Sequence, residues 1–145
     1  MRRPRNVLAV DTSILIAASR GRSKGAIDSV TEYCALVTTD RAITEARRRI
    51  EFGMSAPQLL PALDDVLRDI QIVFTDEIEA DLPAAQVTLR NAVPSRNGSI
   101  NDAHILACAW RANGDIWSFD RDFAGTGVAS WSTANLILAL THEPE

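Results

Sequence analysis

The sequence has 145 residues, a formal net charge of −4, 46% hydrophobic residues and 23% charged residues. These values are typical of one ordinary globular domain with a single core, and they exclude a protein that is basic over its whole surface. No apolar run approaches the roughly 18 residues that a membrane-spanning helix needs, and Asp11 interrupts the apolar stretch after the basic N-terminus. We therefore expect no membrane span and no signal peptide, and we expect a cytoplasmic protein.

Short apolar runs alternate with helical patterns along the chain. In chain order they predict strand 7–10, helix 12–18, helix 26–33, strand 35–39, helix 40–52, helix 58–68, strand 70–74, helix 75–92, loop 94–98, helix 100–112, strand 115–119, strand 128–131 and helix 132–140. We expect Asp40 to cap the third of these helices, and Thr75 or Asp76 to cap the helix that runs to Ala92.

The expected strands are continuous apolar runs that do not alternate with polar residues. This pattern favours an α/β fold with a mainly parallel sheet of four or five strands covered by helices on both faces. No repeat, low-complexity tract or linker divides the chain. We expect one domain over residues 1–145, with its core between about 7 and 140. Cys34 and Cys108 have no partner at metal-ligand spacing, so buried free thiols are expected.

Four acidic residues fall where such a sheet places its reactive groups. Asp11 ends the first strand, Glu45 lies early in the helix after the second, and Asp120 ends the fourth, with Asp122 close behind. Asp102 lies in the first turn of the helix before the fourth strand, and that turn reaches the same edge if the helix runs antiparallel to the strands. In open α/β sheets ligands bind outside the carboxyl ends of the strands, so these acids can share one site.

Such a site needs a cation. Two carboxylates about 4 Å apart repel by roughly 4 kcal/mol at an effective dielectric of 20, a large part of a small domain's stability. A ligand set of oxygens without a His or Cys cluster points to Mg²⁺, with Mn²⁺ as a substitute, and not to zinc. Such an ion can activate water and stabilise the charge that develops on a phosphodiester.

Each acid also has a structural alternative. Asp11 could cap a helix, and Asp102 could close a capping box that starts at Ser99. Glu45 could pair with arginines one turn later, and residues 120–122 could form a simple turn. The interpretation as a site depends on the four acids sharing one edge.

The segments around these acids resemble the PIN-domain family, and within it toxins of the VapC type. The matching segments are Val10-Asp11-Thr12-Ser13-Ile14-Leu15-Ile16, Thr44-Glu45-Ala46-Arg47, Asn101-Asp102-Ala103-His104-Ile105-Leu106-Ala107-Cys108-Ala109 and Ser118-Phe119-Asp120-Arg121-Asp122-Phe123. They occur in the family's order and cover most of the chain. Ser118 stands where a Thr is common and keeps the hydroxyl. Residues 53–94 match only in their pattern of elements.

The resemblance implies a three-layer αβα fold and an endoribonuclease that cleaves single-stranded RNA with a metal-activated water. Carried over by position, Asp11, Glu45, Asp102 and Asp120 are the catalytic and metal-binding residues, with Asp122 as an additional metal ligand. The implied ion is Mg²⁺, which Mn²⁺ can replace. For a VapC-type toxin the implied partners are RNA, a small antitoxin protein that blocks the site, and a second copy in a homodimer. Cleavage by water predicts products with a 5′-phosphate and a 3′-hydroxyl.

Other residues near these motifs favour structural roles. His104 lies off the centre of its helix's apolar stripe, which favours a surface or half-buried histidine over a catalytic one. The three tryptophans are expected in the core. Arg47, Arg48 and Arg49 could hold an RNA backbone or acidic antitoxin residues, or could form a solvated helix face.

The residues argue against two other functions and leave two alternatives open. A haloacid-dehalogenase-like phosphatase needs a second Asp two residues after the first, where this chain has Ser13, and no glycine-rich nucleotide-binding motif is present. A PIN nuclease that acts in RNA processing or decay without an antitoxin remains an alternative. A PIN-like module that binds without catalysis is the other.

Overall fold

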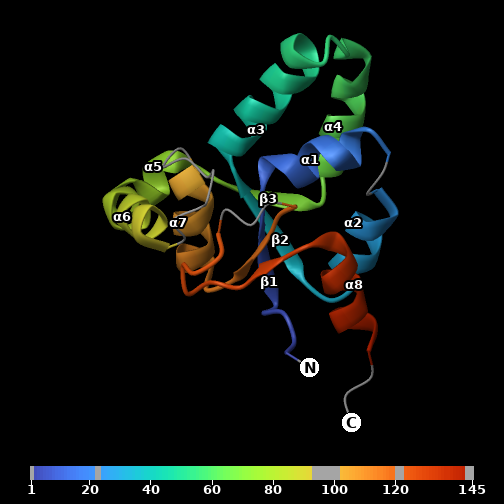
Figure 1. The fold of residues 1–145 in the computed structure, drawn as a ribbon. Coiled ribbons are helices and arrows are strands. Elements are labelled where there is room, and N and C mark those ends of the chain that lie inside the picture. The colour runs from blue at the N-terminus through green and yellow to red at the C-terminus, as the bar shows by residue number, and fades with distance from the viewer. Residues whose placement is uncertain (1, 22–23, 93–101, 120–122, 143–145) are drawn as a thin grey trace.

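The computed structural model describes residues 2–21, 24–92, 102–119 and 123–142. Within these ranges the centre of the molecule is a five-stranded sheet in which every pair of neighbouring strands is parallel. The strands are β1 (Val7–Val10), β2 (Ala35–Thr39), β3 (Ile70–Val73), β4 (Asp115–Trp117) and β5 (Ser130–Trp131). They lie in the order β3-β2-β1-β4-β5, so the first strand forms the middle of the sheet (Figure 1).

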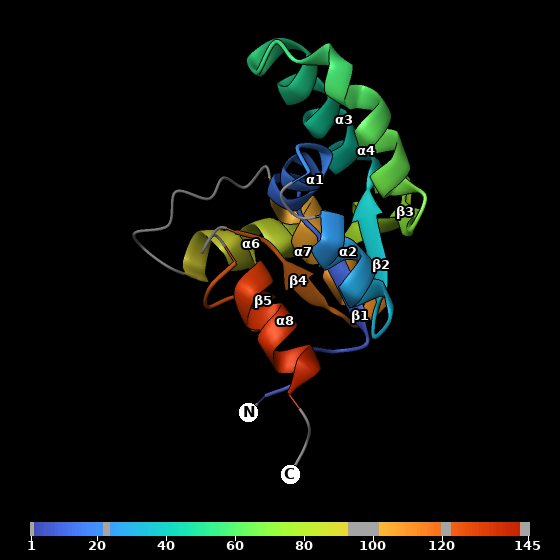
Figure 2. The same ribbon diagram turned by 90° about the vertical axis from the view of Figure 1, so that its right-hand side faces the viewer.

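Helices cover both faces of this sheet. The α-helices in the described ranges are α1 (Thr12–Ser19), α2 (Lys24–Thr31), α3 (Asp40–Arg48), α4 (Leu60–Leu67), α5 (Thr75–Ile78), α6 (Leu82–Ala92), α7 (Ala103–Ala112) and α8 (Thr133–Thr141). Helices α1, α2 and α8 lie on one face and α5, α6 and α7 on the other (Figure 1). Helices α3 and α4 rise together beyond the sheet as an arm between β2 and β3 (Figure 2). The expected three-layer αβα fold is confirmed.

The apolar runs form strands because the sheet is buried on both faces. Leu8, Ala9 and Val10 of β1 are fully buried, and Leu8 pairs with Leu36 of β2 while Ala9 pairs with Ile116 of β4. Both cysteines are buried and free, as expected. No helix in the described ranges is long and apolar enough to cross a membrane.

The junction of α7 and β4 is held by a close backbone approach. Asn113 ends α7 in the left-handed conformation (φ 53°), and Gly114 follows. A Cβ on Gly114 would lie 2.4 Å from the carbonyl oxygen of Val7, so only glycine fits. This contact places the C-terminus of α7 at the start of β1, and α7 therefore runs antiparallel to the strands.

The start of α3 differs from the prediction. Thr39 is the N-cap, because its Oγ1 accepts a hydrogen bond from the Ala42 N–H at 3.0 Å, and Asp40 is the first residue of the helix. The Asp40 carboxylate instead accepts hydrogen bonds from the backbone and hydroxyl of Thr75, at 2.9 and 2.6 Å. The helix ends at Arg48 and continues as a π-helical turn, Arg49–Gly53, so the chain stays helical to the predicted end.

The predicted helix over 75–92 is broken. Helix α5 ends at Ile78, a 3₁₀ turn covers Glu79–Asp81, and α6 begins at Leu82 with Pro83 in its first turn. Proline has no N–H for the carbonyl four residues earlier, so it fits a helix start and interrupts a continuous helix. The N-cap of α5 is Phe74, not Thr75 or Asp76. Predicted loop 94–98 and the predicted first residues of the helix at 100–112 lie outside the described residues.

Candidate active site

Asp11 lies at the carboxyl end of β1, in the middle of the sheet, and is only 6% exposed. Its backbone N–H donates to the Trp117 carbonyl of β4 at 3.0 Å, and its carbonyl accepts from the N–H groups of Ile14 and Leu15. Asp11 is the N-cap residue of α1, but its side chain makes no capping hydrogen bond. Asp11 therefore occupies the N-cap position through its backbone only, and its carboxylate has a role other than capping.

Two serine hydroxyls orient that carboxylate. Ser13 Oγ donates to Asp11 Oδ2 at 3.0 Å, and Ser118 Oγ donates to the same oxygen at 2.9 Å. Ser118 follows β4 and is 2% exposed, so a hydroxyl from a neighbouring strand fixes the buried acid. Sequence reasoning noted that Ser118 keeps a hydroxyl but did not find this contact, because the pair is separated by 107 residues.

Glu45 is joined to the same edge through α1. Its Oε2 accepts a 3.4 Å hydrogen bond from the hydroxyl of Thr12, the residue after Asp11. Its Oε1 lies 2.8 Å from a guanidinium nitrogen of Arg49, one helical turn later, and the Glu45 side chain is 39% exposed. The predicted alternative of a helix ion pair is thus present, and it occurs together with the contact to the Asp11 turn.

The direction of α7 places Asp102 at the carboxyl edge. Asp102 is the N-cap residue of α7 and its side chain does not cap the helix. His104, in the first turn, contacts Thr39 at the end of β2, while the other end of α7 reaches Val7 at the start of β1. The sequence analysis had placed Asp102 three residues into a helix opened by Ser99, which lies outside the described residues.

Asp120 and Asp122 also lie outside the described residues, so the fourth acid has no described position. Strand β4 ends at Trp117, and Ser118, the next residue, lies beside Asp11. In the described ranges alone, no three His, Cys, Asp or Glu side chains are grouped so as to hold a metal ion. Of the predicted acids, Asp11 and Glu45 are linked through Thr12, and Asp102 lies on the helix terminus at the same edge.

His104 differs from its prediction, because it is 2% exposed instead of lying at the surface. Its Nδ1 lies 2.7 Å from Thr39 Oγ1. Burial, reinforced by the charge of Arg41, lowers the pKa of His104 to about 4, so the imidazole is neutral at pH 7. The helix stripe failed to predict this because α7 is buried on nearly every side, from Ala103 to Ala109.

The three consecutive arginines, two at the end of α3 and one in the π-helical turn after it, have different surroundings. Arg47 pairs with Asp64 of α4 at 2.6 Å, and Arg49 pairs with Glu45. Arg48 lines a pocket that also contains Glu45 and His104. Of these three arginines, only Arg48 lines that pocket without an ion pair among the described residues. The tryptophans follow the prediction, with Trp117 fully buried and Trp110 and Trp131 packed against the core.

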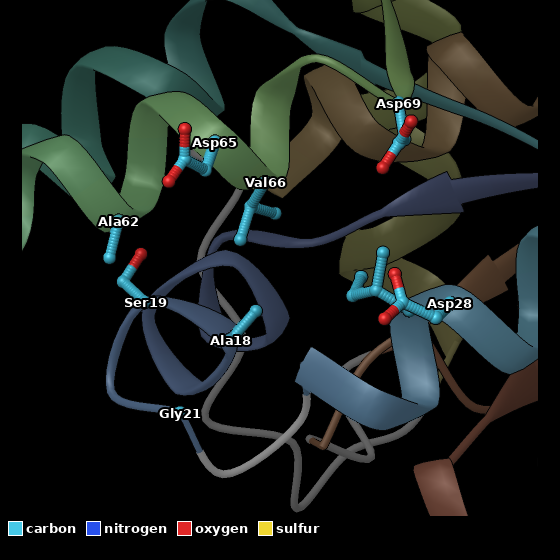
Figure 3. A pocket seen from close by; sticks show the side chains of 9 residues that line it. Ala18, Ser19, Gly21, Asp28, Ala62, Asp65, Val66 and Asp69 are labelled. Atoms are coloured by element: carbon cyan, nitrogen blue, oxygen red, sulfur yellow. The ribbon is translucent and has the colours of Figure 1, made fainter.

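A second pocket, of about 110 Å³, lies between α1, α2 and α4 (Figure 3). Three of its lining residues are acidic, Asp28, Asp65 and Asp69. They come from separate positions around the opening and are not grouped as metal ligands in the described part of the chain.

The comparisons with known proteins agree with this architecture. A family model described as "PIN domain" matches residues 9–141, nearly the whole chain. Among solved structures, VapC20 of Mycobacterium tuberculosis, described as a sarcin-ricin loop cleaving toxin, superposes with a TM-score of 0.62. It is 16% identical, and the match covers 84% of this chain and 96% of that one, which shows a shared fold. No curated protein matches the sequence. The extent of the family match shows that this chain belongs to the PIN-domain family.

Proposed function

We propose that this chain is a metal-dependent endoribonuclease that acts as the toxin of a toxin–antitoxin pair. The observation that carries the proposal is the Asp11 carboxylate, nearly buried at the carboxyl end of the central strand and oriented by the hydroxyls of Ser13 and Ser118. Membership of the PIN-domain family and a fold shared with an RNA-cleaving toxin support the same reaction class.

The donor set fits Mg²⁺ or Mn²⁺. Asp11, Glu45 and Asp102 supply carboxylate oxygens from β1, α3 and the start of α7, and hard divalent cations prefer such ligands. His104 is excluded as a nitrogen ligand through Nδ1, since that atom contacts Thr39. We propose Asp11, Glu45, Asp102 and Asp120 as the metal-binding and catalytic residues, with Asp122 as an additional ligand. A bound cation would supply an activated water and stabilise the charge on the phosphodiester.

The residues of this chain would prepare the site in three ways. Ser13 and Ser118 hold the Asp11 carboxylate in one orientation, so it needs little reorganisation when RNA binds. Thr12 couples that turn to Glu45, and a small movement of α3 would therefore be transmitted to the acids. Arg49 balances the charge of Glu45 before a cation arrives.

The partners follow from the proposed toxin role. We propose RNA as the substrate, a small antitoxin protein that blocks the acidic edge, and a homodimer as the assembled state. We further propose that the protein acts in the cytoplasm, where its RNA substrate lies. We expect the gene for this protein to lie next to a gene for a short DNA-binding antitoxin. The absence of such a neighbouring gene would favour a role in RNA processing.

The test is cleavage of total cellular RNA with EDTA, Mg²⁺ or Mn²⁺, by the wild type and by Asp11→Asn. Asp28→Asn on α2 is the matched control, because it removes an exposed carboxylate that lines the other pocket. We expect discrete, metal-dependent cleavage by the wild type and the control, products with 5′-phosphates, and no cleavage by Asp11→Asn. Products with 2′,3′-cyclic phosphates would mean attack by the ribose hydroxyl. If the wild type neither cleaves RNA nor binds metal, the protein is a non-catalytic PIN-like binding module.

A further inference from the structure

An open pocket of about 440 Å³, here named the α3–α7 pocket, lies beside Glu45. It is lined by Asp40, Arg41, Thr44, Glu45, Arg48 and His104. The residues at 41, 44, 45 and 48 follow a spacing of three, four and seven, so they share one face of α3. His104 approaches from the first turn of α7. The pocket therefore adjoins the candidate active site at the carboxyl end of β2.

The acceptors of the α3–α7 pocket already have donors. Asp40 Oδ1 accepts from the N–H groups of Thr75 and Arg41, at 2.9 and 3.0 Å, and from the Thr75 hydroxyl. Glu45 is paired with Arg49 and contacts the Thr12 hydroxyl. Each carboxylate thus already has donors among the described residues, and Glu45 would keep its proposed metal-binding role at the adjoining site.

The arginine donors of the pocket, by contrast, have no acceptors among the described residues. Among the residues that the structure describes, neither the guanidinium of Arg41 nor that of Arg48 makes an ion pair or a side-chain hydrogen bond. Both residues are exposed on the pocket side of α3. They lie two turns apart, about 10 Å along the helix, and present positive charge toward the same opening.

His104 adds a third donor. Thr39 Oγ1 is fully buried and already accepts from the Ala42 N–H, so its own proton is satisfied by donating to His104 Nδ1 at 2.7 Å. This arrangement places the imidazole proton on Nε2. Nε2 has no hydrogen-bond partner within the described ranges, and His104 lines the pocket. A buried N–H without a partner is destabilising, so an acceptor from a ligand would be favourable there.

We infer that the α3–α7 pocket is a subsite for a phosphodiester of the RNA backbone, held by Arg41, Arg48 and the Nε2–H of His104. A phosphodiester is anionic and offers only acceptors, which matches a pocket whose acceptors are filled and whose donors are not. Its two non-bridging oxygens also suit the planar fork of a guanidinium. The inference rests on the proposed nuclease function and extends it, because the bound phosphate would neighbour the scissile one. The three side chains are positioning residues.

The test is RNA binding in EDTA, where no metal-dependent cleavage occurs. Fluorescence anisotropy with a short labelled single-stranded RNA compares the wild type, Arg41→Gln, Arg48→Gln, their double variant and Arg47→Gln. Arg47→Gln is the matched control, since it removes the same charge from the same helix at a residue paired with Asp64. We expect each single variant to raise Kd about tenfold, the loss of one charged hydrogen-bonded contact, and the double variant to raise it about a hundredfold. The slope of log Kd against log salt should fall by about 0.7, the value for one phosphate of a single strand.

Two substitutions of His104 separate a binding role from a structural one. His104→Gln carries an amide N–H to the region of Nε2, whereas His104→Asn can replace only the contact of Nδ1 with Thr39. We expect His104→Gln to keep most of the RNA affinity and His104→Asn to bind RNA several-fold more weakly. Thermal melting of both variants identifies the fraction folded, so that the comparison uses folded protein only.

Several outcomes would overturn the inference. If the double variant binds RNA as tightly as the wild type, the subsite is rejected. It is also rejected if the wild type binds no RNA. If polyglutamate binding depends on Arg41 and Arg48 while RNA binding does not, the pocket serves an acidic protein segment instead. The cleavage assay gives a separate result. The variants should raise KM and leave kcat close to that of the wild type, whereas metal-independent RNA binding without any cleavage would reject the nuclease and keep the subsite.

Discussion

The hydroxyl of Thr12 lies 3.4 Å from Oε2 of Glu45, and this contact joins the turn that carries Asp11 to the helix that carries Glu45. The two acids are 34 positions apart in the sequence, on segments that leave neighbouring strands of one parallel sheet. The carboxyl ends of parallel strands meet at one edge, so the contact follows from the topology. Because of this contact, we expect a substitution at Asp11 or Glu45 to alter the position of the other side chain.

Asp11→Asn should abolish the stabilisation of the protein by Mn²⁺. A ligand that binds only the folded state adds about 2.7 kcal/mol at a concentration of 100 times its Kd. We expect the wild type and Asp28→Asn to melt at a higher temperature with Mn²⁺, measured by differential scanning calorimetry, and Asp11→Asn to melt at the same temperature with and without it. An Mn²⁺-dependent shift that survives in Asp11→Asn would place the metal elsewhere.

Asp102→Asn tests whether the acids repel one another without a metal. If they share one site, the apo protein should gain stability, because one charge of a repelling group is removed. Urea unfolding in EDTA measures this gain, and isothermal titration with Mn²⁺ should show weaker binding by the same variant. Lower apo stability together with unchanged Mn²⁺ affinity would give Asp102 a purely structural role at the start of α7.

Ser118→Ala should destabilise the protein and reduce cleavage. The substitution removes a hydroxyl that donates to the nearly buried Asp11 carboxylate at 2.9 Å, and hydrogen bonds to charged groups contribute about 1.5–3 kcal/mol. Ser118→Thr is the control, because it keeps the donor. The free energy of unfolding in urea and the rate of RNA cleavage should both recover in the threonine variant. Equal losses in both variants would trace the effect to packing.

Arg49→Gln should strengthen Mn²⁺ binding. Its guanidinium lies 2.8 Å from Glu45 Oε1 and competes with a cation for that oxygen. Both side chains are more than a third exposed, so the pair contributes only about 0–1 kcal/mol to folding, and stability should change little. Arg68→Gln, which breaks an exposed pair with Asp65, is the control. Weaker Mn²⁺ binding by Arg49→Gln in isothermal titration would show that Arg49 orients Glu45 for the metal.

Gly114→Ala should destabilise the fold, because its Cβ would lie 2.4 Å from the carbonyl oxygen of Val7 and force the start of β1 away from α7. Overpacking of this kind costs about 1–3 kcal/mol. Gly25→Ala is the control, since a Cβ there meets nothing within 4 Å on helix α2. Urea unfolding should separate the two variants, and equal stability would show that the α7–β4 junction can relax.

Local sequence patterns were sufficient for most of the fold. The continuous apolar run at 7–10 predicted the central strand, since a strand buried on both faces excludes polar residues. The last helix was predicted to begin at Ser132, and in the structure Ser132 is the N-cap of α8, which begins one residue later. The errors at Thr39 and at the break after Ile78 arise where two neighbouring residues compete for a cap or where one proline resets the hydrogen bonding. The sequence pattern alone could not decide which residue caps α3 or where α5 ends.

The sequence by itself determined the parallel α/β architecture, the family and the acids that can share an edge, because continuous apolar runs that alternate with helical patterns are typical of a parallel sheet covered by helices. Only the tertiary structure decided which groups contact those acids. Ser118 reaches Asp11 across 107 residues, and Thr39 fixes the orientation of a buried His104 across 65. Likewise, of three consecutive arginines, packing against α4 engages Arg47, Glu45 engages Arg49, and Arg48 is left facing the pocket. Such contacts depend on side-chain directions set by packing, which a linear pattern does not encode.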